Sequence, residues 1–400
     1  MKERWVMIQT KTTFTVNSPA TIVYGREAFE EVGVYAKKLG TKALIVSDPI
    51  MEGLGFVNQC RTFLKAKGLE AVTYLGVTTE PVDTYVAQGL EILQAEQCDI
   101  IISVGGGSCI DTAKAIAVVA TNGGYIGDYM KLAKVAEQPP IPHIALPTTA
   151  GTGSEATDAT VITNTTNDVK MMIKQPAFMP PIAIVDPMLT LTSPPAITAA
   201  TGIDALSHAI ESYISLLAHP YSNVLALSAM DLIINNIMKV YEQGDDIDAR
   251  EAMSLGSMQA GLAFSNASVA LVHGMSRPIG ALFHVPHGIS NAMLLPAVLE
   301  FTKDACVDRL ADIGKYFNKD GKYGTQEELA TLAIDSIKAL CKKMHIGNLQ
   351  QWGIKEEAFY AAIPKMATDA IASGSPANNP KVPTQDELME LYKVAYHYEF

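Results

Sequence analysis

Short apolar runs alternate with longer helix-like stretches through the first half of the chain. The runs cover residues 43–47, 71–75, 100–104, 144–146 and 182–185. Between them lie segments whose apolar residues have helical spacing, such as 82–97 and 111–121. Uninterrupted apolar strands separated by helices are typical of a parallel sheet that is buried on both faces. The pattern therefore predicts an α/β nucleotide-binding domain.

The pattern changes after Pro187. The segment Ser193-Pro194-Pro195 predicts a helix that begins with Ser193 as N-cap and has prolines in its first turn. From there to Phe400 the spacing is mostly helical, and no series of strands follows. We therefore expect two domains: an α/β N-terminal domain with a parallel sheet over residues 1–190, and an all-helical C-terminal domain over 191–400.

Composition and charge exclude several classes of protein. Hydrophobic residues make up 48% of the 400 and charged residues 18%, which excludes a disordered chain. The net charge of −12 comes without a basic stripe, so we expect no nucleic-acid partner. No run of about 18 apolar residues indicates a membrane span. The five cysteines form no CxxC pair, so we expect free thiols, with disulfides or a thiolate zinc site as weaker alternatives. The first residues have no signal-peptide pattern, and together with free thiols this predicts a cytoplasmic location.

A glycine loop follows the apolar run 100–104. It consists of Gly105, Gly106, Gly107 and Ser108, and we expect the next helix to open near Asp111. Glycines let the backbone approach an anion closely, and the first amides of a helix attract phosphate. A plain structural turn is common at such a place, but the position between a buried strand and a helix favours phosphate binding. The loop is not GxGxxG, which disfavours an ordinary Rossmann dehydrogenase.

Two other segments at strand ends could contact a cofactor. Asp48 ends an apolar run, where a carboxylate could bind ribose hydroxyls or cap the helix that follows Pro49. The loop 146–155 is rich in threonine and glycine. Its hydroxyls and amides could serve a cofactor or only one another, and the sequence leaves both interpretations open.

A group of metal-ligand residue types falls in the helical half. Asp204 and His208 are four residues apart, so they share one helix face, and Glu211 lies about one turn further along. His273 follows an apolar run, and His287 lies in a Val-Pro-His-Gly segment. Buried polar groups must be paired or metal-bound. One carboxylate and three imidazoles without a thiolate suit Fe²⁺ or Zn²⁺.

The alternative is that each histidine is an ordinary core or surface residue. One histidine alone would favour that view, and four such groups in one domain shift the balance toward a metal. We interpret Glu211 as an ion-pair neighbour of the site and not as a ligand. His143 and His219 look structural, whereas His284 lies close enough to His287 for a role in the site to stay open.

On these motifs the chain resembles the iron-containing (group III) alcohol dehydrogenases along its whole length. The motifs are GGGSxxD at 105–111, TTAGTGSE at 148–155, Asp186-Pro187, TGIDALSHAIE ending at Glu211, the segment 264–288 and Asn379-Pro380. Within the family it is similar to lactaldehyde reductases, propanediol dehydrogenases and NAD-dependent methanol dehydrogenases. The implied activity is reversible hydride transfer between NAD and a short primary alcohol or its aldehyde, with a divalent metal as Lewis acid.

The resemblance also implies site residues. The implied ligands of one divalent ion, Fe²⁺ or Zn²⁺, are Asp204, His208, His273 and His287. The implied NAD contacts are Gly105, Gly106, Gly107, Ser108 and Asp111 at the pyrophosphate, Asp48 as the residue favouring NAD over NADP, and Thr148, Thr149, Thr152 and Lys170 at the nicotinamide half. Phe264 falls at a substrate-pocket position, and we expect a homodimer or a higher homo-oligomer.

Two positions depart from the family pattern. Many members have histidine where this chain has Arg277, and asparagine where it has Glu80. A guanidinium cannot relay a proton. Arg277 is therefore expected either to pair with a nearby carboxylate or to hold the anionic tail of a substrate such as sulfoacetaldehyde or succinic semialdehyde. The competing functions are an NAD- and metal-dependent lyase resembling dehydroquinate synthase, and a redox-silent NAD-binding protein.

Overall fold

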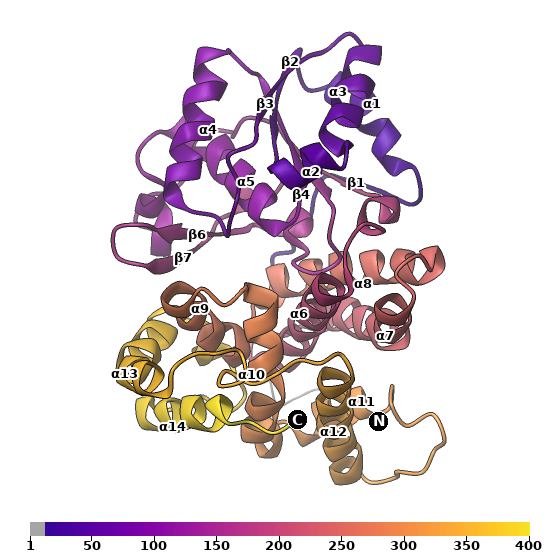
Figure 1. Ribbon diagram of the computed structural model, residues 1–400, viewed down its shortest axis with the longest axis vertical. Coiled ribbons are helices and arrows are strands. Elements are labelled where there is room, and N and C mark those ends of the chain that lie inside the picture. The colour runs from indigo at the N-terminus through magenta and orange to yellow at the C-terminus, as the bar shows by residue number, and fades with distance from the viewer. Residues whose placement is uncertain (1–12) are drawn as a thin grey trace.

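The computed structural model describes residues 13–400 and divides into a sheet-containing part and a helical part (Figure 1). The first part holds a six-stranded parallel sheet in the order β1-β8-β5-β4-β2-β3. Its strands are β1 (Thr21–Tyr24), β2 (Lys42–Val46), β3 (Glu70–Tyr74), β4 (Ile100–Gly105), β5 (His143–Pro147) and β8 (Ile182–Val185). All five predicted strands belong to this sheet, which confirms the α/β prediction. Residues 1–12, where no signal-peptide pattern was found, lie outside the described part.

Helices cover both faces of the sheet. Successive residues of β2 point to opposite layers: Leu44 and Val46 pack with α4 (Asp83–Ala95) and α5 (Gly107–Asn122), whereas Ala43 and Ile45 pack with α1 (Val32–Ala36) and α3 (Phe56–Ala66). Because both faces are covered, every residue of β4 is buried and its sequence is continuously apolar up to the glycine loop. Helix α2 (Pro49–Gly53) follows β2 directly.

An antiparallel hairpin of β6 (Ala159–Asn164) and β7 (Val169–Lys174) was not predicted. It extends from the sheet-containing part toward the helical part and lies next to α9 (Figure 1). Short 3₁₀ helices occupy several connections: η1 (Ala28–Glu31), η2 (Ile126–Leu132), η3 (Ser154–Ala156), η4 (Pro176–Phe178), η5 (Pro187–Thr190), η6 (Lys303–Ala305) and η7 (Ser375–Asn378). The hairpin matters most for function, because it brings Lys170 and Lys174 to the junction of the two parts.

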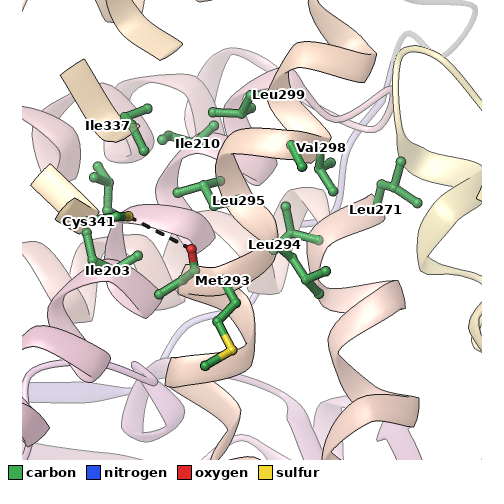
Figure 2. Close-up of a cluster of buried hydrophobic side chains, with 14 of the residues drawn as sticks. Ile203, Ile210, Leu271, Met293, Leu294, Leu295, Val298, Leu299, Ile337 and Cys341 are labelled. Atoms are coloured by element: carbon green, nitrogen blue, oxygen red, sulfur yellow. Dashed lines mark hydrogen bonds between the residues drawn. The ribbon is translucent and has the colours of Figure 1, made fainter. Parts of the chain in front are cut away.

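The second part is helical, as predicted. Its helices are α6 (Pro195–Ile214), α7 (Pro220–Glu242), α8 (Ile247–Ala267), α9 (Leu271–Phe283), α10 (His287–Thr302), α11 (Val307–Gly314), α12 (Gln326–Lys343), α13 (Glu356–Ala372) and α14 (Gln385–Tyr396). Most of helix α10 is buried in the core, where Leu295 and Leu299 lie toward Ile210 and Ile337, and Leu294 lies on the other side toward Leu271 (Figure 2). This core fixes α6, α9 and α10 relative to one another.

Two predicted helix starts were wrong. Helix α6 begins at Pro195 with Pro194 as its N-cap, and no side chain caps it, so Ser193 lies outside the helix. Helix α5 begins at Gly107 and not near Asp111. Gly106 is the N-cap and Gly107 the first residue of the helix, so the glycine loop leads directly into it. The proposed domain boundary between residues 190 and 191 stays a prediction.

Helix α7 is the one helix in the described residues whose length and composition would suit a membrane span. It packs along α6 and α8, and Ala226, Met230, Ile233 and Ile237 belong to the helical core. A core helix of a soluble protein has the same composition, so this feature is weak support for a membrane span.

Candidate active site

Three helices bring four ligand-type side chains together in the helical part. Asp204 and His208 come from α6, His273 from the first turn of α9, and His287 from the first position of α10. One potential ligand atom from each lies within 4.8 Å of the other three. The i, i+4 spacing on α6 therefore places two donors on one face, and the packing of α9 and α10 against α6 supplies the other two.

Glu211 lies behind this group and orients one of its members. Its carboxylate accepts hydrogen bonds from the Val272 amide at 2.6 Å and from Nδ1 of His273. Nδ1 of His273 therefore carries a proton, and Nε2 is the ring nitrogen that faces Asp204, 3.6 Å from its Oδ1. A carboxylate behind a histidine is the usual support for a metal-ligating imidazole. Glu211 is thus an ion-pair neighbour of the four donors, as we expected.

Asn291 was not predicted, although it lies at the centre of the group. Its Nδ2 is 2.6 Å from Oδ1 of Asp204, 3.0 Å from Nε2 of His273 and 3.2 Å from Nε2 of His287. Its Oδ1 is buried and has no hydrogen-bond partner among the described residues. Three lone pairs from different helices thus converge on one point, which is the arrangement that a cation requires.

The electrostatics of the group favour a bound cation. Burial would raise the pKa of Asp204, but His208, His287 and His273 beside it hold that pKa below its ordinary value. Burial lowers the pKa of His208 to about 4 and that of His287 well below its usual range, although Asp204 opposes both shifts. Burial also acts to lower the pKa of His273, but Glu211 and Asp204 beside it raise that pKa above its ordinary value. An ionised Asp204 and neutral His208 and His287 are in the protonation states that ligate metals, and a bound cation would displace any proton on Nε2 of His273. Nδ1 of His208 is also buried without a partner in the described structure. The donor set fits one divalent ion such as Fe²⁺ or Zn²⁺.

Of the other histidines, none joins this group. His143 is buried in β5 beside Ser103, and His219 stacks on Phe14 and contacts the Asn266 carbonyl. His284 is exposed at the end of α9 in a left-handed backbone conformation. His284 therefore caps the end of α9 and does not belong to the four-donor group.

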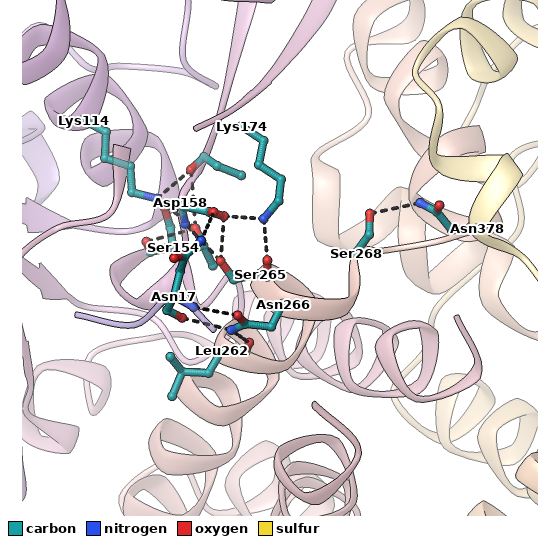
Figure 3. A network of polar contacts seen from close by, with 12 residues as sticks. Asn17, Lys114, Ser154, Asp158, Lys174, Leu262, Ser265, Asn266, Ser268 and Asn378 are labelled. Atoms are coloured by element: carbon teal, nitrogen blue, oxygen red, sulfur yellow. Dashed lines mark hydrogen bonds and ion pairs between the residues drawn. The ribbon is translucent and has the colours of Figure 1, made fainter. Parts of the chain in front are cut away.

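Phe264 forms one side of the site. Its ring stacks on His208 with centroids 4.4 Å apart. The segment that follows it is held from two sides (Figure 3): Asp158 accepts from Ser265 Oγ at 2.8 Å and pairs with Lys174, while Asn378 donates to Ser268 Oγ at 3.0 Å. These contacts tie the sheet-containing part and the late segment η7 to the connection between α8 and α9. They fix Phe264 and the start of α9 together.

The glycine loop and the threonine-rich loop pack against each other. A Cβ on Gly107 would lie 2.7 Å from Thr152, so a side chain there would push the loops apart, whereas Gly106 lies at contact distance from Thr149. Behind them, the buried Lys114 ammonium donates to Ser154, Thr157 and the Ala159 carbonyl (Figure 3). The threonine-rich loop is therefore fixed by α5 as well as by its own hydrogen bonds.

Most predicted cofactor contacts line one cavity of about 320 Å³ between the two parts. It is lined by Gly106, Gly107, Ser108, Asp111, Thr149, Thr152 and Lys170 on one side and by His208, Phe264, His273, Arg277 and His287 on the other. Asp48, Gly105 and Thr148 do not line it; the Thr148 amide bonds to the Gly105 carbonyl at the ends of β4 and β5. The two parts of the chain thus contribute opposite walls to one cavity.

Two of the predicted cofactor carboxylates have structural partners. Asp111 accepts from Ser154 Oγ and, at 2.8 Å, from the Val161 amide, so its oxygens hold the hairpin and the neighbouring loop. Asp48 caps α2 through Oδ1, which accepts from Ile50 and Met51 at 2.7 and 2.9 Å. The capping interpretation of Asp48 is confirmed, and its other oxygen faces Gly105 at the edge of the glycine loop. A role for either residue in cofactor binding stays a prediction.

Arg277 lies in α9, one turn after His273, and lines the cavity. It is only 6% exposed, and Nη1 donates to Ser375 Oγ at 2.7 Å. Among the described residues no carboxylate oxygen lies within 4.0 Å of it, whereas Lys170 and Lys174 pair with Glu80 and Asp158. Burial lowers the pKa of Arg277 to about 10, with Glu211 opposing the shift, so the guanidinium stays charged at neutral pH. The expected pairing with a carboxylate is not present.

Comparison with known proteins agrees with this arrangement. Residues 19–187 match the family model described as iron-containing alcohol dehydrogenase, and residues 198–396 match the C-terminal model of the same family. An NAD-dependent methanol dehydrogenase of Bacillus methanolicus is 38% identical over 379 residues, covering 94% of this chain and 98% of that protein.

Solved structures show the same fold. A 1,3-propanediol oxidoreductase is 36% identical with a TM-score of 0.92, covering 96% of this chain and 100% of the other. A sulfoacetaldehyde reductase of Bifidobacterium kashiwanohense, in complex with NAD⁺, is 28% identical with a TM-score of 0.85, covering 97% and 100%. Both the family models and these relatives span nearly the whole chain. The chain therefore belongs to the iron-containing alcohol dehydrogenase family and is an oxidoreductase.

Proposed function

We propose that the protein is an NAD- and metal-dependent alcohol dehydrogenase or aldehyde reductase that acts on short primary alcohols and aldehydes. The observation that carries this proposal is the shared cavity, which has the glycine loop in one wall and the four-donor group in the other. Family membership favours an oxidoreductase over a lyase or a redox-silent NAD-binding protein. A homo-oligomer, expected from the family resemblance, and a cytoplasmic location, expected from the cysteines and the first residues, stay predictions.

The two walls have separate tasks. Asp204, His208, His273 and His287 would hold the ion, and Glu211 would keep His273 in the ligating tautomer. A bound divalent ion supplies Lewis-acid polarisation of the substrate oxygen, and NAD supplies the two-electron carrier. The amides of Gly107 and Ser108, in the first turn of α5, would face the cofactor phosphates. Phe264 covers His208 and shapes the apolar side of the substrate pocket.

We propose further that the substrate carries a short anionic tail. Arg277 is a buried cation in the cavity wall, one helical turn from a proposed ligand, and it has no carboxylate partner within 4.0 Å in the described structure. Burying an unpaired charge is costly, so an anion supplied by the substrate would be bound with little competition. The similarity to a sulfoacetaldehyde reductase supports this class. Sulfoacetaldehyde and succinic semialdehyde are the candidates.

The test compares NADH oxidation with short anionic and short neutral aldehydes. We expect kcat/KM to be at least roughly tenfold higher for the anionic aldehydes than for propionaldehyde or lactaldehyde, the value of one charge-assisted hydrogen bond. Arg277→His should remove this preference and spare neutral substrates, while Arg277→Lys should keep part of it, because the charge remains without the planar fork. Equal use of both aldehyde classes, unchanged by Arg277→His, would contradict the anionic tail and leave the dehydrogenase assignment standing.

A further inference from the structure

Glu80 connects elements of the two parts across the cavity. It lies in the connection between β3 and α4, immediately before Pro81, and its side chain is 34% exposed in the cavity wall. One carboxylate oxygen, Oε1, accepts a hydrogen bond from the His287 amide at 2.9 Å. The other, Oε2, forms an ion pair with Nζ of Lys170. A single carboxylate thus contacts the start of α10 and the hairpin strand β7.

The contact with His287 stabilises the start of a helix. The first amides of a helix have no acceptor within it, and His287 is the first residue of α10. A carboxylate at this end accepts such a hydrogen bond and also interacts favourably with the helix dipole. The His287 imidazole belongs to the four-donor group. Because Pro286 precedes His287, the backbone position of His287 determines where that imidazole lies. Glu80 therefore restrains a proposed metal ligand through its backbone.

The contact with Lys170 supplies the counter-charge of a buried ammonium group. Lys170 is 5% exposed at its side chain, and Glu80 is the one carboxylate within 4.0 Å of it in the described structure. Its Nζ lies against α9, where a Cβ on Gly280 would be 2.3 Å away, so a larger residue at 280 would displace the ammonium group from this position. Without Glu80 the ammonium would be buried and unpaired, which favours a different side-chain position. Glu80 therefore also restrains a proposed cofactor contact.

We infer that Glu80 is a positioning residue that holds the metal half and the cofactor half of the site in register. This inference rests on the proposed function, because it takes His287 as a metal ligand and Lys170 as a cofactor contact. The two oxygens make the roles separable by substitution. A glutamine at position 80 has one acceptor oxygen, which can still serve the His287 amide, but it has no charge to offer Lys170.

The experiment measures two binding properties without measuring turnover. One is the rate at which a chelator removes Co²⁺ or Zn²⁺ from the loaded protein, and the other is the Kd for NADH, followed by NADH fluorescence. Glu80→Ala should release the ion roughly tenfold faster and bind NADH roughly tenfold more weakly than wild type, since it loses both charge-assisted contacts. Glu80→Gln should keep the slow release and show the weaker NADH binding. Lys170→Met should match Glu80→Gln.

Glu96→Ala is the matched control, because Glu96 forms an ion pair with Lys42 at 2.8 Å, is 47% exposed and does not line the cavity. Both properties should be unchanged in this variant. Wild-type values of both properties in Glu80→Ala, or equal changes in the control, would overturn the inference. If Glu80→Ala does not fold, Glu80→Gln and Lys170→Met decide, and faster ion release in either contradicts it. A wild-type protein that retains no ion and binds no NADH would instead refute the proposed function.

Discussion

Replacing Glu211 with glutamine should weaken the metal site without touching a ligand. Both oxygens of Glu211 accept hydrogen bonds from N–H groups, one from the Val272 amide at 2.6 Å and one from Nδ1 of His273. A glutamine amide has a single acceptor oxygen, so its NH₂ group must face one of these two donors. If it faces His273, the imidazole proton moves to Nε2, the nitrogen that faces Asp204 and the proposed ion.

The magnitude follows from the contact that is lost. Because Glu211 and His273 are 1% and 3% exposed at their side chains, water does not replace the missing partner. One charge-assisted hydrogen bond is worth about 1.5–3 kcal/mol. At about 1.4 kcal/mol for each factor of ten, the affinity for the ion should fall by roughly 10- to 100-fold. The protein should still fold, because the carboxylate is replaced by an amide of nearly the same shape.

The assay is a competition titration of the metal-free protein with Zn²⁺ or Co²⁺ against a fluorescent chelator. Glu300→Gln serves as control, since Glu300 lies on α10 but accepts one hydrogen bond from Tyr398 away from the donor group. Glu211→Gln with an affinity within twofold of wild type would show that the carboxylate does not set the His273 tautomer. Equal losses in both variants would attribute the effect to general destabilisation.

Two further predictions concern the sheet-containing part. Asp48→Gly should narrow the NADH/NADPH ratio of kcat/KM, because a carboxylate beside a 2′-phosphate brings like charges together; equal use of both cofactors by wild type would refute this role. Burial raises the pKa of Glu155 from 4.5 to about 7, with its own backbone amide and Lys114 opposing the shift. Between these values the unfolded chain releases a proton that the folded chain retains, so the free energy of unfolding should fall by about 3 kcal/mol as pH rises through this window. Glu155→Gln should remove that fall in denaturant titrations at pH 5 and pH 8, and an unchanged difference between the two pH values would contradict the shift.

The parts of the fold that the sequence predicted are those with strong local periodicity. Strand β4 is apolar throughout because helices cover both of its faces, so its sequence alone identified it. Strand β1 is four residues long, partly exposed along its length and at the edge of the sheet, and it gave no comparable signal. Strand β6 of the hairpin alternates in burial, with Thr160 and Ile162 buried, but it was not predicted from the sequence. The predicted helix start at Ser193 was wrong because no side chain caps helix α6.

The candidate site followed the same rule. The spacing of Asp204 and His208 on one helix and the family motifs located the four donors. Asn291 could have been found, since it lies one helical turn after His287. The contacts of Ser375 with Arg277 and of Glu80 with His287 could not be predicted, because the partners are 98 and 207 residues apart in the chain and only the packed fold joins them. The position of Arg277 in the cavity wall, with no carboxylate within 4.0 Å in the described structure, also depends on how the two parts pack and could not be predicted from the sequence.

The central claim is that catalysis depends on one divalent ion held by the four-donor group. It is tested most directly by preparing the protein free of metal, reloading it with increasing Fe²⁺ or Zn²⁺, and measuring bound metal together with NADH oxidation by a short aldehyde. Activity should be absent without metal and rise in proportion to bound ion up to one per chain, and His273→Ala should lose metal and activity together. Full activity in a demonstrably metal-free preparation, or full activity of His273→Ala, would contradict the account.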